Sequence, residues 1–455
     1  MRYRIEKDKL GEMQVPAEAY YGIHTLRSRR NFQISKRPIN RQMIKGLANV
    51  KRAAAKANYD AGLLKKDVCD AIVLSCNEIL NGRLHGQFIT DLIQGGAGTS
   101  MNMNANEVIA NRANEMLGSQ KGKYDKVHPI DDVNLSQSAN DVVPTAGKIA
   151  TIRLTKKLLV EMKKLATAYR KLGKEHKDVY TFSKTHLLDN VPISFGKIFN
   201  AMGSSVDRSV KKVESAMANL LEVNLGGTSV GLGHTTNKVY TTKVIEYLCE
   251  FTNEKFHVSK NPVDTTRHLD SFAWLSASIK TFALNINKHA NDLRLISSSY
   301  GLVELPEVQL GSVSYPGKVN PVIPEMVNQV VFYMEGNDLT ISRAVASGEL
   351  DLNVNLPIIL ACLFENLNFI RRAIRALREK ALEGLEIVDQ NIDFKADDSI
   401  ITIFLQKLGY EKSQEVISLA KDNGKTVLEV IVENDYLSKA EVDKIFIKEA
   451  EKFKK

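Results

Sequence analysis

The chain has 455 residues, of which 44% are apolar, so it is long enough to bury a large core. Its 62 Lys and Arg residues exceed the 53 Asp and Glu residues and give a formal net charge of +9. The lysines are spread along helical patterns and only 7% of residues are aromatic. The sequence therefore argues against nucleic-acid binding and favours the attraction of small anions.

The cysteines bear on metal binding, and the first residues bear on the cellular compartment. The four cysteines form no CxxC pair and no cluster with histidine, which indicates reduced core thiols and no metal site. The charged start, residues 1–7, has no apolar signal core, and no run of about twenty apolar residues occurs. We therefore expect a cytoplasmic protein without a membrane segment.

Residues 1 to about 35 look irregular or briefly extended. Helices are predicted at about 40–62 and 65–81, where apolar residues recur every three or four positions. Next comes the glycine-rich stretch 94–107, in which Thr99 stands where a helix could begin, a position that favours anions. No lysine follows at the spacing of a nucleotide phosphate loop. A tight turn with a Ser or Thr helix cap explains this stretch as well as a carboxylate cradle does.

A second polar cluster, residues 136–141, precedes a long helical pattern, so Ser138 or Asn140 could serve only as a helix cap. Neither Gly nor Pro occurs from 148 to 172. Further long helices are predicted at about 193–222, 264–296, 323–346 and 357–384. Several long helices with short connections indicate a helical bundle, and their broad apolar coverage suggests an oligomer core.

Two more polar interruptions follow. Residues 183–192 contain His186 beside Thr185, although a lone histidine is more often an ordinary surface residue. Residues 311–321 combine small hydroxyl residues, Gly and Pro with Lys318 and Asn320, which is typical of a loop between helices. Taken alone, this loop could simply face water.

The tail from about 388 alternates short helices, so the predicted domains are 1–140, 141–387 and 388–455. The fold is predicted to be mainly α with a central long-helix bundle. The four interruptions offer hydroxyls, amides, one histidine and one lysine. That inventory suits binding of a small carboxylate and transfer of one proton, and neither redox nor phosphoryl chemistry.

In their order, the four clusters resemble the signatures of the aspartase/fumarase superfamily. The last loop is similar to its mobile Gly-Ser-Ser-x-x-Pro-x-Lys-x-Asn-Pro signature. The stretches 20–27, 94–100 and 319–330 look aspartase-like rather than fumarase-like. The resemblance implies a three-domain fold, a homotetramer with a helical core, and active sites that each draw residues from three subunits. It also implies elimination of ammonia or an amine from an amino acid to give an α,β-unsaturated acid, without a cofactor.

The resemblance assigns the base and the grip on the substrate. Ser312 would be the general base, as an alkoxide stabilised by backbone N–H groups of a closing lid. Lys318 and Asn320, with Thr185, would hold the α-carboxylate. Ser312, Lys318 and His186 are thus the expected catalytic residues.

The resemblance also assigns the remaining contacts. Asn140 and His186 would hold the amino group, and Glu325 would orient His186. Thr99 and Ser138 would cradle the activating β-carboxylate.

The chain departs from the family pattern around that carboxylate. Ala139 and Val313 replace hydroxyl residues, and Tyr315 replaces a methionine, so the substrate would meet a less polar surface. Each hydrogen bond to a charged group is worth roughly 1.5–3 kcal/mol. Losing two could therefore weaken transition-state binding of aspartate by about a hundredfold to several thousandfold.

Aspartate, giving fumarate, is the default substrate. The departure keeps a second reading open: an amine-lyase acting on a substrate such as a histidine betaine, as in the ergothionases, with release of trimethylamine. A fumarase or an inactive structural relative fits the sequence less well.

Overall fold

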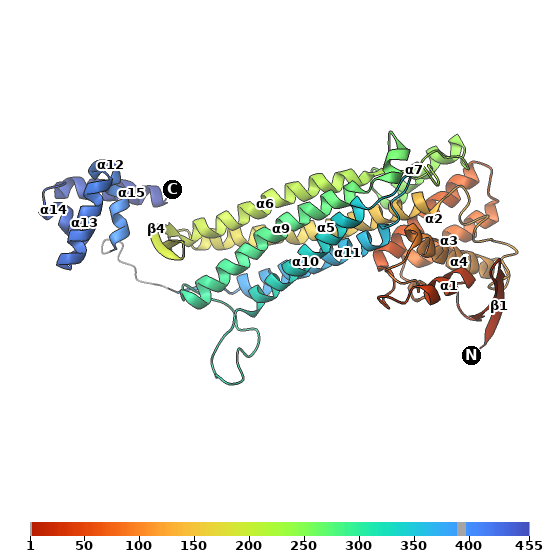
Figure 1. The fold of residues 1–455 in the computed structure, drawn as a ribbon, viewed down its shortest axis with the longest axis horizontal. Coiled ribbons are helices and arrows are strands. Elements are labelled where there is room, and N and C mark those ends of the chain that lie inside the picture. The colour runs from red at the N-terminus through yellow and green to blue at the C-terminus, as the bar shows by residue number, and fades with distance from the viewer. Residues whose placement is uncertain (1, 389–396, 455) are drawn as a thin grey trace. The chain divides into compact units, whose positions relative to one another are not determined.

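The computed structural model describes residues 2–388 and 397–454, and the prediction of a mainly helical fold is confirmed (Figure 1). The α-helices of the described residues are α1 (Ile23–Asn31), α2 (Arg41–Asp60), α3 (Lys66–Leu80), α4 (Thr99–Met116), α5 (Ala139–Glu175), α6 (Phe195–Ala218), α7 (Lys238–Thr252), α8 (Pro262–Arg267), α9 (Asp270–Arg294), α10 (Val322–Ala346), α11 (Leu356–Leu377), α12 (Leu405–Leu408), α13 (Tyr410–Asn423), α14 (Val427–Glu433) and α15 (Lys439–Lys454). No helix of this part of the chain is both long and apolar enough to cross a bilayer.

The strands are short and pair only in twos. They are β1 (Tyr3–Asp8), β2 (Gly11–Pro16), β3 (Tyr180–Thr185), β4 (Leu188–Ser194), β5 (Glu222–Val223), β6 (His257–Val258), β7 (Val303–Glu304) and β8 (Glu386–Ile387). The pairs β1–β2, β3–β4 and β7–β8 are antiparallel, and β5–β6 is parallel.

The chain divides into two compact units. Unit 1 comprises residues 1–161, 209–284 and 329–372, and unit 2 comprises residues 162–208, 285–328 and 373–455. The division into three domains at 140 and 387 remains a prediction. Residues 389–396, which lie at the start of the predicted tail domain, are outside the described residues.

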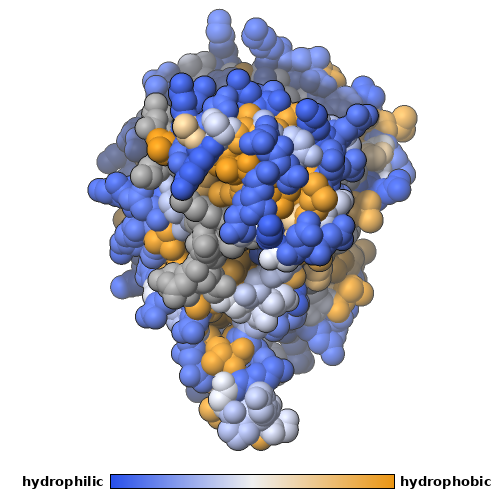
Figure 2. Space-filling view, turned by 90° about the vertical axis from the view of Figure 1, so that its left-hand side faces the viewer, coloured by the Kyte–Doolittle hydropathy of each residue, from blue (hydrophilic) through white to orange (hydrophobic). Residues whose placement is uncertain are grey.

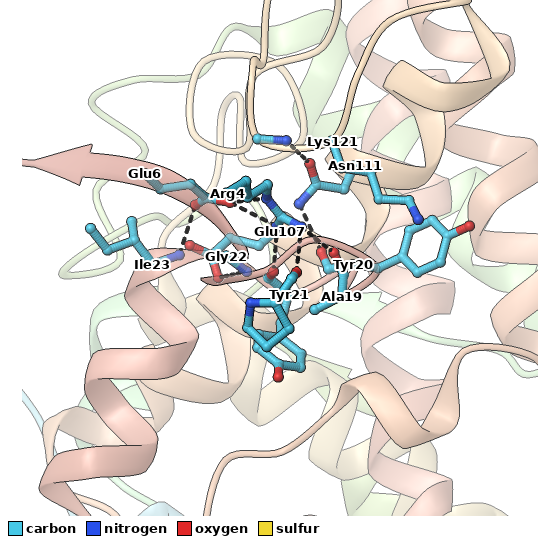
Figure 3. Close-up of polar contacts among 12 residues, drawn as sticks. Arg4, Glu6, Ala19, Tyr20, Tyr21, Gly22, Ile23, Glu107, Asn111 and Lys121 are labelled. Carbon is cyan, nitrogen blue, oxygen red and sulfur yellow. Dashed lines mark hydrogen bonds and ion pairs between the residues drawn. The ribbon is translucent and has the colours of Figure 1, made fainter. Parts of the chain in front are cut away.

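The β1–β2 hairpin agrees with the expectation that residues 1 to about 35 are irregular or briefly extended, whereas helix α1 corrects it. Glu107, buried on α4, accepts hydrogen bonds from the backbone N–H groups of Gly22 (2.8 Å), His24 (2.9 Å) and Thr25 (3.1 Å), as Figure 3 shows for Gly22. Glu6 accepts from the N–H of Ile23 at 2.8 Å. Two remote carboxylates thus cap this helix, in place of a local capping residue.

Gly22 is required where these carboxylates meet the chain. A Cβ there would lie 2.5 Å from the Tyr124 hydroxyl oxygen and 2.7 and 2.8 Å from the carboxylates of Glu6 and Glu107. Any side chain would push these caps away from the helix. Burial raises the pKa of Glu6, and the neighbouring Arg4 guanidinium opposes that shift.

The core of unit 1 follows the predicted apolar periodicity. Helix α2 packs against α3 and α7, and Leu47, Val50 and Ile72 are fully buried. Helices α2 and α3 match the predictions at 40–62 and 65–81 to within about two residues.

Two elements differ from the predicted pattern, the first in unit 2 and the second beginning in unit 1. The interruption at 183–192 is a β-hairpin, β3–β4, rather than an irregular loop. The helix predicted at 264–296 is broken, because His268 is extended between α8 and α9, and a π-helical turn at Leu295–Ser299 follows α9.

The last helices of unit 2 have an apolar core of their own. It includes Ile400, Phe404, Val416, Val430 and Ile431, each at most 2% exposed. The helical character of this tail therefore agrees with the sequence pattern.

On the face shown in Figure 2, hydrophilic side chains predominate and hydrophobic ones form smaller patches between them.

Candidate active site

The glycine-rich turn of unit 1 leads directly into α4. Gly96 and Gly98 have φ angles of 76° and 87°, which favour glycine. Helix α4 begins at Thr99, as predicted, but Gly98 occupies the cap position. The Thr99 hydroxyl donates to Gly96 O at 2.7 Å and its side chain is exposed. Thr99 thus stands at an open helix N-terminus.

The same turn lies against the start of α5. A Cβ on Gly98 would come within 2.7 Å of Val143 Cγ1, so glycine permits this close approach. Ser138 precedes α5, and its Oγ accepts from the N–H of Asn140 at 3.2 Å, which makes it the cap. The N-termini of α4 and α5 therefore lie close together beside Thr99 and Ser138, and the positive ends of two helix dipoles attract carboxylates.

Asp141 anchors this region and was missed by the sequence reasoning. It is fully buried and accepts from the backbone N–H groups of Ser138 (2.9 Å), Gly226 (3.1 Å) and Thr228 (3.1 Å). Burial raises the pKa of its carboxyl, and the three N–H donors oppose that shift. The signal for it was a charged residue within a long apolar helical pattern.

Lys51 is a second buried charge that the sequence reasoning missed. Its Nζ donates to Asn134 Oδ1 at 2.8 Å and to Gln137 Oε1 at 3.0 Å. Burial lowers the pKa of this ammonium group, and the Asp141 carboxylate opposes that shift. Lys51 therefore supports the segment that leads into Ser138.

Asn140 is held by the loop that follows β5. Its Nδ2 donates to Ser229 O at 2.8 Å, and Asn224 Nδ2 donates to Asn140 O at 3.1 Å. Ala139, between Ser138 and Asn140, adds no hydroxyl to this surface. The predicted contact of Asn140 with an amino group stays a prediction.

In unit 2, Thr185 and His186 lie at the tip of the β3–β4 hairpin. The two-residue turn consists of His186 and Leu187, with φ angles of 53° and 65°. Both Thr185 and His186 are exposed, and Thr185 Oγ1 accepts from Asn190 Nδ2 at 3.2 Å. This hairpin presents the predicted pair to solvent.

The loop at 311–321 surrounds Ser312 Oγ with hydrogen-bond donors. The N–H groups of Ser314 (3.2 Å) and Tyr315 (3.0 Å) donate to it, and the Ser314 hydroxyl lies 3.2 Å away. Donors placed in this way favour negative charge on the oxygen. Val313 and Tyr315 point outward, with 99% and 66% of their surface exposed.

The two ends of this loop are tied together. Asn320 Nδ2 donates to Gly311 O. A Cβ on Gly311 would collide with Lys318 O, so only glycine fits at this crossing. Asn320 therefore already has a role in shaping the loop.

A cavity of about 1040 Å³ lies beside the loop within unit 2. Its lining includes Lys318, Asn320 and Glu325, together with Arg294 and the serines of the π-helical turn. Glu325 sits in the first turn of α10. No hydrogen bond of the described residues joins Glu325 to His186, so their predicted pairing is not formed within this chain.

The described residues contain no group of three or more His, Cys, Asp and Glu side chains that could hold a metal ion. The predicted site residues of the two units supply hydroxyls, amides, one lysine and one histidine. These groups can bind carboxylates and move a proton.

Comparisons with known proteins cover nearly the whole chain. A family model described as "Lyase" matches residues 11–336, and one described as "Fumarase C C-terminus" matches residues 400–450. Aspartate ammonia-lyase of Bacillus subtilis is 41% identical over 447 residues, which cover 97% of this chain and 94% of that protein.

Solved structures show the same likeness. A fumarate lyase:delta crystallin from Brucella melitensis, in a cobalt-bound crystal, matches with a TM-score of 0.93 at 38% identity and covers 98% of each chain. A class II fumarase from Schistosoma mansoni matches with a TM-score of 0.93 at 30% identity, again with 98% coverage of each chain.

Proposed function

This chain belongs to the aspartase/fumarase superfamily and is a carbon–nitrogen lyase, and on that premise we propose that it converts L-aspartate to fumarate and ammonia. The observation that carries the proposal is the set of donors around Ser312 Oγ. These donors suit an oxygen that must become negatively charged before it removes a proton from carbon.

The reaction begins at C3 of the substrate. Ser312, as an alkoxide, takes a proton from C3, and the electron pair left behind is delocalised into the β-carboxylate. That pair then forms the C2–C3 double bond as the C2–N bond breaks and ammonia leaves. Negative charge grows on the β-carboxylate during proton removal, so the helix N-termini beside Thr99 and Ser138 stabilise the transition state more than the bound substrate.

The other end of the substrate needs a firm grip. Lys318, Asn320 and Thr185 hold the α-carboxylate in this proposal. Lys318 is exposed, and no ion pair of the described residues occupies it. Asn140 and His186 hold the amino group, and Glu325 orients His186. Closure of the loop would exclude water from the carbanion.

We also propose a cytoplasmic homotetramer with each site shared by three subunits. Support comes from large apolar side chains left uncovered on a long helix. Phe332 and Leu339 lie seven residues apart on one face of α10 and are 60% and 59% exposed. All four cysteines are free, which suits a reducing compartment.

A second candidate substrate follows from Ala139 and Val313. Neither side chain can donate to a β-carboxylate, so an amino acid or betaine with an activating heteroaromatic ring is the alternative. Ergothioneine, with trimethylamine as the leaving group, represents this class.

The test gives the purified enzyme L-aspartate and ergothioneine in parallel, with fumarate followed by its ultraviolet absorbance and trimethylamine measured directly. We expect fumarate from aspartate, and release of trimethylamine alone would replace aspartate with the second candidate. Ser312→Ala should lower kcat by about 10²–10⁴-fold with an unchanged circular dichroism spectrum. Ser204→Ala, an exposed serine on α6, is the matched control and should be neutral. Equal activity of Ser312→Ala and wild type would exclude Ser312 as the base.

A further inference from the structure

The turn that carries His186 has an unfavourable backbone. Its two residues, His186 and Leu187, both have positive φ angles, 53° and 65°. Two-residue hairpin turns of this kind favour Asn and Gly, because a Cβ is disfavoured in the left-handed region. A turn made of His and Leu is expected to depend on contacts from outside the hairpin.

Tyr300 supplies such a contact from a distant part of unit 2. Its hydroxyl donates to the Leu187 carbonyl at 2.7 Å. The ammonium group of Lys184, on β3, lies 4.9 Å from the centroid of the Tyr300 ring. Lys184 also pairs with Asp189 on β4. One aromatic side chain therefore contacts both the turn and the strand that leads into it.

The backbone around Tyr300 is itself fixed. Tyr300 ends the π-helical turn, and its N–H donates to Leu295 O at 3.0 Å. Two residues later, the N–H of Leu302 donates to Ile296 O at 2.7 Å, and Val303 pairs with Ile387. The Tyr300 hydroxyl therefore extends from a segment whose backbone is held in place by hydrogen bonds.

We propose that Tyr300 is a positioning residue that holds the Thr185–His186 turn in the geometry needed to bind substrate. The inference rests on the proposed function, which gives Thr185 the α-carboxylate and His186 the amino group. Tyr300 acts through the Leu187 carbonyl and contacts no substrate atom. Loss of the Tyr300 hydroxyl should therefore weaken binding of the substrate and of the transition state equally.

The test is Tyr300→Phe, which removes the hydroxyl and keeps the ring over Lys184. We expect KM for L-aspartate to rise about five-fold, the usual worth of one neutral hydrogen bond, with kcat within about two-fold of wild type. Amide hydrogen exchange of residues 183–190 should accelerate in the same variant. A merely structural role would instead lower the active fraction and leave KM unchanged.

Tyr247→Phe is the matched control, because its hydroxyl donates to Asp60 over the same 2.7 Å far along the chain from the hairpin. It should change neither KM nor the exchange of 183–190. Unchanged exchange or unchanged KM in Tyr300→Phe would overturn the inference. If wild type forms no fumarate, the proposed function fails, and the exchange comparison still decides whether Tyr300 holds the turn.

Discussion

Ser314→Ala tests whether the loop stabilises a charged Ser312. The substitution removes the hydroxyl 3.2 Å from Ser312 Oγ and leaves the two backbone N–H donors in place. A hydrogen bond to a charged group contributes roughly 1.5–3 kcal/mol, and exposure of Ser314 favours the lower end of that range. At 1.36 kcal/mol per pH unit, the loss corresponds to a shift of about one unit.

The measurement is the pH profile of kcat/KM for L-aspartate. Its acidic limb, where the base must lose its proton, should move upward by about one pH unit. On that limb, kcat/KM should fall about tenfold, and the two enzymes should converge at higher pH. Ser314→Thr keeps a hydroxyl and should keep the wild-type limb. A uniform loss across all pH values, or no loss at all, would refute the role of this hydroxyl.

Two further predictions concern the loop crossing and a buried histidine. Gly311→Ala forces a methyl group against Lys318 O and should lower kcat/KM by at least about 100-fold in steady-state assays, whereas Gly86→Ala, in open space, should be neutral. Burial lowers the pKa of His289 from 6.5 to about 4, so only the unfolded chain takes up this proton between those values. Stability should be fully present above pH 6.5 and fall by about 3 kcal/mol towards pH 4. In urea unfolding at fixed protein concentration, His289→Gln should reduce the dependence of the free energy of unfolding on pH. His257→Gln, at an exposed position, is the control and should leave that dependence unchanged. The same pH dependence in His289→Gln and wild type would contradict the prediction.

The sequence alone predicted those helices and loops whose structure depends mainly on neighbouring residues. The apolar periodicity of α2, α3 and α10 predicted helices that the structure confirms. The glycines and prolines of 311–321 predicted a loop, which is also present. Each of these segments carries its own signal in its spacing or its helix-breaking residues.

Other features depend on residues far apart in the sequence. The β3–β4 hairpin has His186 and Leu187 at its turn, so no Asn-Gly signal marked it, and the Tyr300 contact comes from 113 positions away. Asp141 was overlooked because its three N–H donors include two from the loop after β5. The roles proposed for Ser312 and His186 depend on the proposed homotetramer, and the local sequence around either residue does not show which subunits would meet there.

The capping of α1 has a consequence for the order of folding. A nine-residue helix is marginal alone, and here three of the four amides at its N-terminus wait for an acceptor more than eighty positions downstream. During synthesis, residues 23–31 cannot become stably helical until Glu107 has emerged and α4 has docked. This early segment therefore settles only after α4 has formed, and a chain that ends before Glu107 leaves it without that partner.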